Sequence, residues 1–162
     1  MKTSILASTI LVLLSTSANA AIDKITVSGI STSQHNTKGT DYVYNSEHDM
    51  FGVMVNDKYI ISKFKNSYYE RSYAVAYNFN LFEANYGDFE FGADFALGLV
   101  SGYNRDQLKQ AYFGNGIGLY SFTSLTAEYN ITKNVSVGVT LGFLPYMYGV
   151  ITTQHLTLSY KF

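Results

Sequence analysis

The stretch HLTLSYKF, residues 155–162, places an apolar side chain at every second position. One face carries Leu156, Leu158, Tyr160 and Phe162, and the opposite face carries His155, Thr157, Ser159 and Lys161. A strand with lipid on one side and a barrel lumen on the other must alternate with this period of two. The same period recurs in NVSVGVTLGFL (134–144) and in DFEFGADFALGLV (88–100), so three long amphipathic strands are predicted.

The faces opposite the apolar ones carry mostly Gly, Ala, Ser and Thr. Small side chains suit the narrow, filled interior of a small barrel. A soluble lipocalin-like barrel has the same number of strands, but it would turn its apolar face inward and show a more charged exterior. We therefore expect an all-β protein, an eight-stranded antiparallel transmembrane β-barrel of the outer-membrane type, located in the bacterial outer membrane.

Weaker alternation predicts the five remaining strands at 24–33, 50–55, 58–65, 73–79 and 117–129. Short turns are expected at Asn56-Asp57 and Thr132-Lys133, and a medium one at 81–87. The other connections are expected at 34–49, 66–71, 101–116 and 145–149. Outer-membrane barrels have short periplasmic turns and longer outer loops, so the sequence predicts that His35 and Asn66-Ser67 share the outer rim.

Residues 1–20 have the composition of a cleavable signal peptide. Lys2 precedes an apolar run from Ile5 to Leu14, and small residues end the segment at Ala20. Residues 21–162 are then expected to form a single barrel domain. The chain has no Cys, a net charge of −1 and no basic tract, which argues against disulfides and against nucleic acid as a partner.

The stretch KFKNSYYERSYAVAYNF, residues 63–79, changes from a polar cluster to strand-like alternation just after Asn66-Ser67. A His near a hydroxyl, with a carboxylate or amide beside them, is the minimum equipment for acyl transfer. His35 would accept the proton of Ser67, and Asn66 would position either group or donate to a developing oxyanion. Asn-Ser is also ordinary turn chemistry, and a loop His is ordinarily solvated, so the residues alone leave both interpretations open.

The segment FKNSYYERSYAVAYNF (64–79) resembles the corresponding region of the PagP-like lipid A palmitoyltransferase family and its short phage- and bacteria-encoded relatives. The order of other features is also similar: His35 in the first outer loop, then Tyr44-Asn45, Phe51-Gly52 and GLVSGY at 98–103. In that family a Lys-Asp/Asn-Ser tripeptide precedes a strand of small and aromatic residues.

This resemblance implies an enzyme that moves a palmitoyl chain from an outer-leaflet phospholipid to lipid A at the extracellular rim. Its catalytic His, Asp and Ser correspond to His35, Asn66 and Ser67, and no metal or soluble cofactor is implied. Asn66 departs from the family because an amide cannot stabilise an imidazolium by charge. The single proline, Pro145, implies one lateral opening of the barrel wall, with none supported near 106–108.

The alternative is a non-enzymatic small outer-membrane barrel that modifies surface properties or receptor access. For either function the expected partners are outer-membrane lipids, namely a phospholipid donor and lipid A as acceptor for the enzyme, and the barrel assembly machinery, which would read the terminal Phe162. The chain is expected to be a monomer.

Other polar residues have simpler interpretations. His48, between Glu47 and Asp49, is expected in a solvated loop rather than at a metal, and His155 in the lumen rather than in a deacylase site. Glu90 and Asp94 are expected to form lumen ion pairs with cations drawn from Lys63, Lys65, Arg71 and Lys161. The rim tyrosines read as an interfacial aromatic girdle: Tyr68, Tyr69, Tyr103, Tyr112, Tyr146 and Tyr148.

Overall fold

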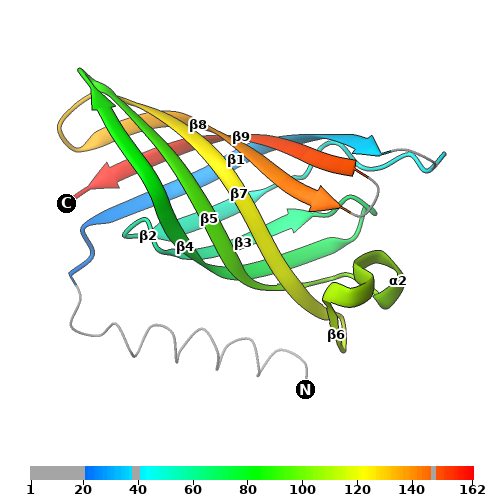
Figure 1. The fold of residues 1–162 in the computed structure, drawn as a ribbon. Helices are drawn as coiled ribbons and strands as arrows, with labels where there is room; N and C mark the ends of the chain where they lie inside the picture. The colour runs from blue at the N-terminus through cyan, green and yellow to red at the C-terminus, as the bar shows by residue number, and fades with distance from the viewer. Residues whose placement is uncertain (1–20, 38–40, 147–148) are drawn as a thin grey trace.

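The strands of the computed structural model, which describes residues 21–37, 41–146 and 149–162, close into an antiparallel barrel (Figure 1). The strands are β1 (Lys24–Thr37), β2 (Phe51–Val55), β3 (Tyr59–Lys65), β4 (Arg71–Tyr86), β5 (Phe89–Ser101), β6 (Tyr112–Gly114), β7 (Ile117–Asn130), β8 (Val135–Tyr146) and β9 (Gly149–Lys161). All but the short β6 form the barrel, which β1–β9 and β5–β7 pairing closes. The eight-stranded fold is therefore confirmed, and the predicted signal peptide lies outside the described residues.

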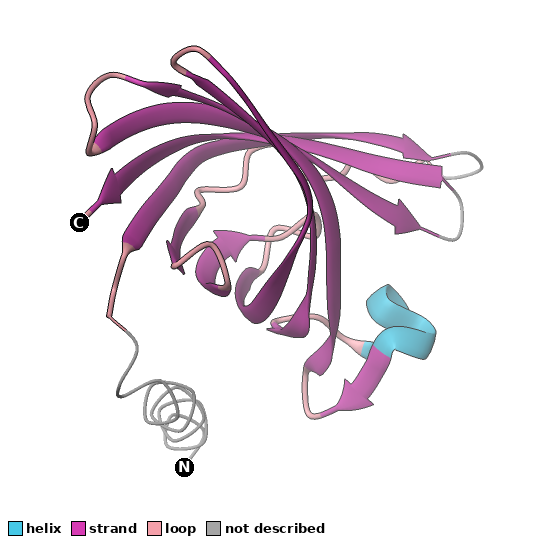
Figure 2. Ribbon diagram, turned by 60° about the vertical axis from the view of Figure 1, so that its left-hand side comes forward, coloured by secondary structure: helices cyan, strands magenta, loops and turns pink. Residues whose placement is uncertain are grey.

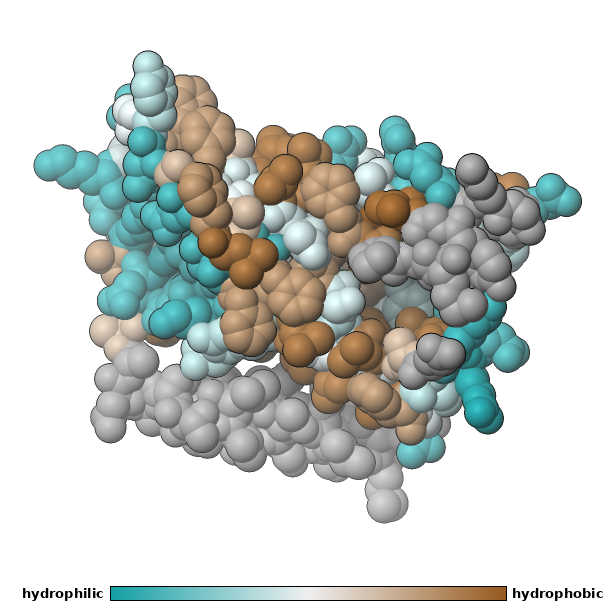
Figure 3. All heavy atoms as spheres, in the orientation of Figure 1, coloured by the Kyte–Doolittle hydropathy of each residue, from teal (hydrophilic) through white to brown (hydrophobic). Residues whose placement is uncertain are grey.

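The barrel turns its apolar side chains outward. On β9, Leu158 is 53% exposed whereas its neighbour Ser159 is 1% exposed, as the alternation predicts. Apolar residues form a band across the middle of the molecule, and hydrophilic residues gather toward both ends (Figure 3). An apolar exterior around a polar interior is the arrangement of a barrel that crosses a lipid bilayer. The chain is thus an outer-membrane-type barrel of the bacterial outer membrane.

No helix in the described part of the chain is long and apolar enough to cross a membrane.

Strand β4 is longer than the sequence predicts. It continues to Tyr86, and only Gly87 and Asp88 turn the chain, so the predicted end at residue 79 and the medium turn at 81–87 are wrong. The reason is a bulge between Asn80 and Phe82, which interrupts the alternation of side chains without ending the pairing with β5. A bulge of this kind looks like the end of a strand in the sequence.

Strand β1 is also longer than predicted and runs through His35 to Thr37. A register shift between Gly29 and Thr32 accommodates Ile30, which has a positive φ of 50° and is exposed. His35 therefore belongs to a strand that pairs with β9, and not to a loop as expected. At the other side of the rim β8 continues through Pro145 to Tyr146, and part of the predicted 145–149 connection lies outside the described residues.

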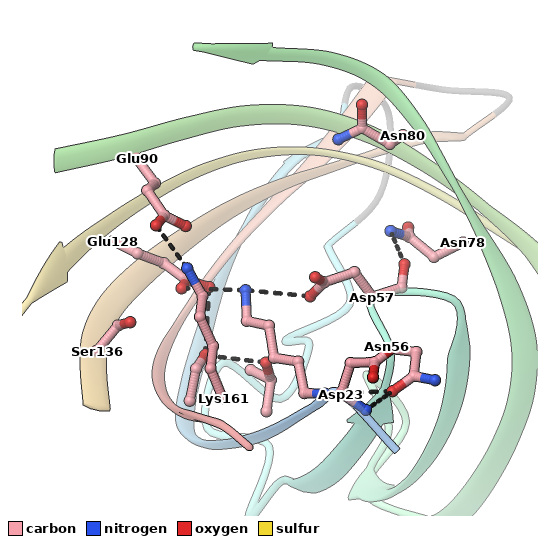
Figure 4. Close-up of polar contacts among 12 residues, drawn as sticks. Asp23, Asn56, Asp57, Asn78, Asn80, Glu90, Glu128, Ser136 and Lys161 are labelled. Carbon is pink, nitrogen blue, oxygen red and sulfur yellow. Dashed lines mark hydrogen bonds and ion pairs between the residues drawn. The ribbon is translucent and has the colours of Figure 1, made fainter. Parts of the chain in front are cut away.

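A network of charged side chains crosses the inner half of the lumen (Figure 4). Lys24 Nζ lies 3.2 Å from Asp57 Oδ1 and 3.3 Å from Glu128 Oε2. Lys161 Nζ lies 2.6 Å from Glu90 Oε1, which confirms one of the predicted ion pairs.

Asp94 was expected to pair with a cation, but its carboxylate accepts hydrogen bonds from the Asn78 and Asn80 amides instead. The predicted cations Lys63 and Arg71 face away from the lumen and are exposed, because their positions alternate with buried Ser62 and Ser72. Lys24, which the sequence did not single out, bridges two carboxylates in the network.

The longer connections lie at the end of the barrel opposite the C-terminus (Figure 2). They include helix α2 (Arg105–Leu108) and the 3-10 turn η1 (Lys109–Ala111). Asn104 caps α2, since its Oδ1 accepts from the Gln107 N–H at 3.0 Å while Gln107 Oε1 accepts from the Asn104 N–H at 2.8 Å. Leu108 packs over Gly118 of β7, where any larger side chain would collide with it.

Candidate functional site at the outer rim

A cavity of about 380 Å³ occupies the outer half of the barrel. Its wall is mainly apolar and aromatic, and both predicted reactive side chains, His35 and Ser67, line it. The lining also includes Tyr44, Tyr103, Tyr120, Phe122, Thr153 and His155. The charge network crosses the lumen on the inner side of this cavity.

His35 and Ser67 meet at hydrogen-bond distance. His35 Nε2 lies 2.8 Å from Ser67 Oγ, although the two residues are 32 positions apart in the chain. Strand β1 turns His35 inward between the outward Gln34 and Asn36, and a tight turn after β3 supplies Ser67. The separation fits transfer of a proton from the hydroxyl to the imidazole. The structure therefore brings two of the three predicted site residues to hydrogen-bond distance of each other.

Asn66 directly precedes Ser67 in this turn, and its side chain is fully buried, with 0% exposure. Its Oδ1 accepts from the N–H groups of Tyr68 and Glu70, at 2.8 and 3.0 Å. Its Nδ2 donates to Gly102 O at 2.9 Å and to Ser72 Oγ at 3.0 Å. Both amide hydrogens are thus engaged and neither is available to an oxyanion. Asn66 shapes the turn that contains Ser67.

The segment 41–50 clamps both members of the His35–Ser67 pair. The Tyr44 ring stacks on the His35 ring, with centroids 4.6 Å apart and planes 10° apart. The Asn45 N–H donates to Ser67 O at 2.9 Å, and Asn45 Nδ2 donates to Asn66 O at 3.1 Å. Sequence reasoning noted Tyr44-Asn45 only as part of the family resemblance, and nothing in the local pattern reveals these contacts.

His48 is buried, with 7% exposure, so the expectation of a solvated loop is wrong. Its Nδ1 lies 2.7 Å from Lys65 O, a pure acceptor, so Nδ1 carries the proton and Nε2 accepts from the Ser33 hydroxyl at 2.7 Å. Together with the backbone bonds from His48 N–H to Ser31 O and from Lys65 N–H to His48 O, they hold this part of segment 41–50 in the barrel wall between β1 and the end of β3. Among the residues that the structure describes, no group of three His, Cys, Asp or Glu side chains is arranged to hold a metal ion.

The environment of His35 favours its neutral form. The outward neighbours Gln34 and Asn36 are exposed and polar, so this end of β1 lies above the apolar band. Burial lowers the pKa of His35 below its ordinary value, and the proximity of His48 lowers it further. A neutral imidazole with its proton on Nδ1 leaves Nε2 free to accept a proton from Ser67.

The barrel wall is unpaired beside the cavity. Pairing between β7 and β8 ends at Thr123 and Phe143, and beyond it, among the described residues, β8 pairs only with β9. Leu119 and Ser121 point outward by alternation, yet both line the cavity, which therefore reaches the outer surface of the wall here. The gap lies beside the end of β8 that contains Pro145, where one lateral opening is expected.

Comparison with known proteins gives fold-level likeness only. No protein-family model and no curated protein matches the chain. Two solved structures of Ail, the attachment invasion locus protein of Yersinia pestis, are similar to it, one of them in complex with the heparin analogue sucrose octasulfate. The complex is 12% identical with a TM-score of 0.45, and the other structure is 15% identical with a TM-score of 0.34. Each comparison covers 88% of this chain and 100% of the other.

Proposed function

We propose that this barrel is an outer-membrane acyltransferase that moves an acyl chain from a phospholipid to lipid A at the extracellular rim. The observation that carries the proposal is the 2.8 Å contact between His35 Nε2 and Ser67 Oγ at the wall of a cavity that is mainly apolar. A hydroxyl beside a neutral imidazole is an activated nucleophile, and an apolar cavity next to it suits a hydrocarbon chain. The resemblance to the PagP-like palmitoyltransferase family supports the same reaction.

The proposed reaction has two balanced half-reactions. Ser67 Oγ attacks the ester carbonyl carbon of the donor while His35 Nε2 takes the hydroxyl proton, and the bond from carbonyl carbon to donor oxygen then breaks. His35 returns the proton to the departing alkoxide. In the second half, a hydroxyl of the acceptor attacks the acyl-serine and gives its proton to His35, which passes it back to Ser67 Oγ. No redox step or cofactor is needed.

The group that orients His35 differs from the carboxylate of a complete catalytic triad. No described carboxylate contacts His35, and Asn66 is occupied by the turn. We infer that the stacked Tyr44 ring holds the imidazole in place instead. Without a carboxylate to stabilise the imidazolium, the rate enhancement is expected to be lower than in a complete triad.

The unpaired stretch between β7 and β8 supports a membrane route for the donor. Lipid in the outer leaflet faces the barrel wall, and the cavity reaches that wall beside Leu119. A phospholipid chain that enters sideways avoids crossing the aqueous rim, where its exposure to water is unfavourable.

The second candidate function is a non-enzymatic barrel that alters the cell surface or blocks receptor access. The two similar structures reported above are those of an attachment protein rather than of an acyltransferase, so they lend the enzyme no support. The exposed tyrosines at the rim, such as Tyr42 and Tyr69, are compatible with a contact surface.

Lipid A profiling distinguishes the two functions. The chain is expressed in cells that lack their own lipid A palmitoyltransferase, and lipid A is examined by mass spectrometry. The enzyme predicts an added acyl mass that disappears in Ser67→Ala and in His35→Ala and persists in Ser46→Ala, an exposed serine of segment 41–50. An unchanged profile with folded barrel in the outer membrane would leave the surface function as the better account.

A further inference from the structure

The cavity wall contains hydroxyl groups that have nothing to bind. Tyr103 and Tyr120 line the cavity, and neither hydroxyl has a hydrogen-bond partner among the described residues. The Gly102 N–H donates to Gly116 O at 3.1 Å, which holds the segment before Tyr103 against the start of β7, the strand that contains Tyr120. Both phenols therefore reach the same cavity, and burial raises the pKa of Tyr103, which keeps its phenol protonated. Enclosing an unpaired hydroxyl against hydrocarbon costs about 1–3 kcal/mol. A saturated chain in this cavity would leave both hydroxyls unpaired.

Tyr103 lies beside the nucleophile. The Asn66 amide, next to Ser67, donates to the carbonyl of Gly102, next to Tyr103, at 2.9 Å. The rings of Tyr68 and Tyr103 also contact each other edge to face, with centroids 6.4 Å apart. The turn that presents Ser67 and the residue that presents the Tyr103 phenol are thus fixed to one another. A group that meets this phenol belongs to the part of the substrate nearest the reacting ester.

Deeper in the cavity the wall changes character. The Phe122 ring follows Tyr120 at 6.2 Å, and His155 follows Phe122 at 6.3 Å, both in stacked geometry. Gly142 leaves room for the Phe122 ring, because a Cβ at that position would collide with it. Along this wall the Phe122 ring therefore separates Tyr120 from His155.

We propose that the cavity takes a hydroxyacyl chain, with its hydroxyl close to the carboxyl end, and that Tyr103 and Tyr120 bind this hydroxyl. A phenol both donates and accepts, so two phenols can satisfy one alcohol completely. The proposal rests on the proposed acyl transfer and specifies the substrate class of that site. A site built to hydrogen-bond a substrate hydroxyl discriminates strongly against the analogue that lacks it, since its own polar groups are then left unpaired.

The test compares three phospholipid donors of equal chain length with the purified protein in vesicles: a 3-hydroxyacyl donor, a plain acyl donor, and a donor hydroxylated near the far end of the chain. The 3-hydroxyacyl donor is expected to react with a kcat/KM at least about tenfold above both others. The measured ratio is the kcat/KM of the 3-hydroxyacyl donor divided by that of the plain acyl donor. Tyr103→Phe and Tyr120→Phe each lower this ratio, because they slow the reaction of the 3-hydroxyacyl donor and leave that of the plain donor unchanged. Tyr69→Phe, which removes the hydroxyl of an exposed rim tyrosine outside the cavity lining, leaves the ratio unchanged.

A ratio near one in the unmodified protein, or a ratio that survives both phenylalanine variants, would overturn the proposal. Binding of free fatty acids to Ser67→Ala separates it from the proposed function, because this readout needs no reaction. Tighter binding of the 3-hydroxy acid together with no transfer from any donor would reject the acyltransferase and retain the hydroxyacyl site. Transfer from the plain donor, with no binding advantage for the 3-hydroxy acid, would reject the hydroxyacyl site alone.

Discussion

At the residue scale, the contacts of Asn66 suit an amide and not a carboxylate. Its two N–H groups meet the Gly102 carbonyl and the Ser72 hydroxyl, and its oxygen meets two backbone N–H groups. A carboxylate in this place could accept from the two backbone N–H groups, but its other oxygen would face the Gly102 carbonyl, which needs a donor. The turn therefore requires an amide at position 66.

Asn66→Asp is expected to lower the free energy of unfolding by about 1–3 kcal/mol at neutral pH, because a buried carbonyl loses its donor and faces a charge. The repulsion raises the pKa of the introduced carboxyl above its unfolded value, so the protonated form folds better. The deficit should therefore shrink as the pH falls and the carboxyl is protonated. Urea unfolding in phospholipid vesicles measures both effects, and a variant as stable as the parent at neutral pH would contradict this role of Asn66.

The state of His35 gives a pH prediction. Its pKa is lowered by burial, and only the neutral imidazole accepts the Ser67 proton. As the pH falls, activity is lost only when it passes the lowered pKa. The acid limb of kcat/KM should thus have its midpoint below about 6.5, the ordinary value for histidine. A midpoint at or above that value would show that the imidazole is not buried as the structure has it.

Thr153 offers a stability prediction in the opposite direction. Its Oγ1 is buried without a hydrogen-bond partner among the described residues. Thr153→Val replaces the hydroxyl with a methyl group of similar size, so the free energy of unfolding should rise by roughly 1 kcal/mol. Urea titration in vesicles checks this, and a clear loss of stability would mean that the hydroxyl has a partner in the membrane-inserted protein.

At the element scale, segment 41–50 contacts both His35 and Ser67. Tyr44→Phe keeps the ring on His35 and should retain activity, whereas Tyr44→Ala removes it and should lower kcat about tenfold or more, since small misplacements of a catalytic group are costly. Because the ring orients the base rather than binding lipid, the donor KM should change little. Equal kcat values for the two variants would show that the Tyr44 ring does not orient His35.

The elements also show how far the sequence reaches. Alternation located the eight barrel strands. The segments 88–100 and 134–144 needed little correction, whereas the strand predicted at 155–162 begins at Gly149. The bulges at Ile30 and near Leu81 could not be seen, because each changes the register while the hydrogen-bonded pairing continues. The His35–Ser67 contact followed from a family resemblance and from connectivity. The roles of Tyr44, Asn45 and Tyr103 depend on contacts between distant segments, which leave no local pattern in the sequence.

At the scale of the whole molecule, the lumen is divided between stability and function. The inner half contains the ion pairs around Lys24 and Lys161, and the outer half holds the cavity. The charges fix strands that are distant in sequence, since Lys24 of β1 joins the β2–β3 turn to β7.

Lys24→Met is expected to lower the free energy of unfolding by roughly 3 kcal/mol, because two carboxylates lose their shared partner. Combining Lys24→Met with Glu128→Gln and Asp57→Asn should restore much of the lost stability. Lys58→Met, at an exposed lysine of the β2–β3 turn, should have little effect. Equal effects of Lys24→Met and Lys58→Met would mean that the network does not stabilise the barrel.

Acyl transfer by His35 and Ser67 is tested most directly by following a labelled acyl chain in the presence of the purified protein. The barrel is reconstituted in vesicles with a labelled phospholipid and lipid A, and loss of label from the donor is timed. We predict steady transfer to lipid A by the parent protein and by Ser46→Ala, and loss of transfer in Ser67→Ala and His35→Ala with the barrel still folded. Transfer by Ser67→Ala at the parent rate would contradict the account.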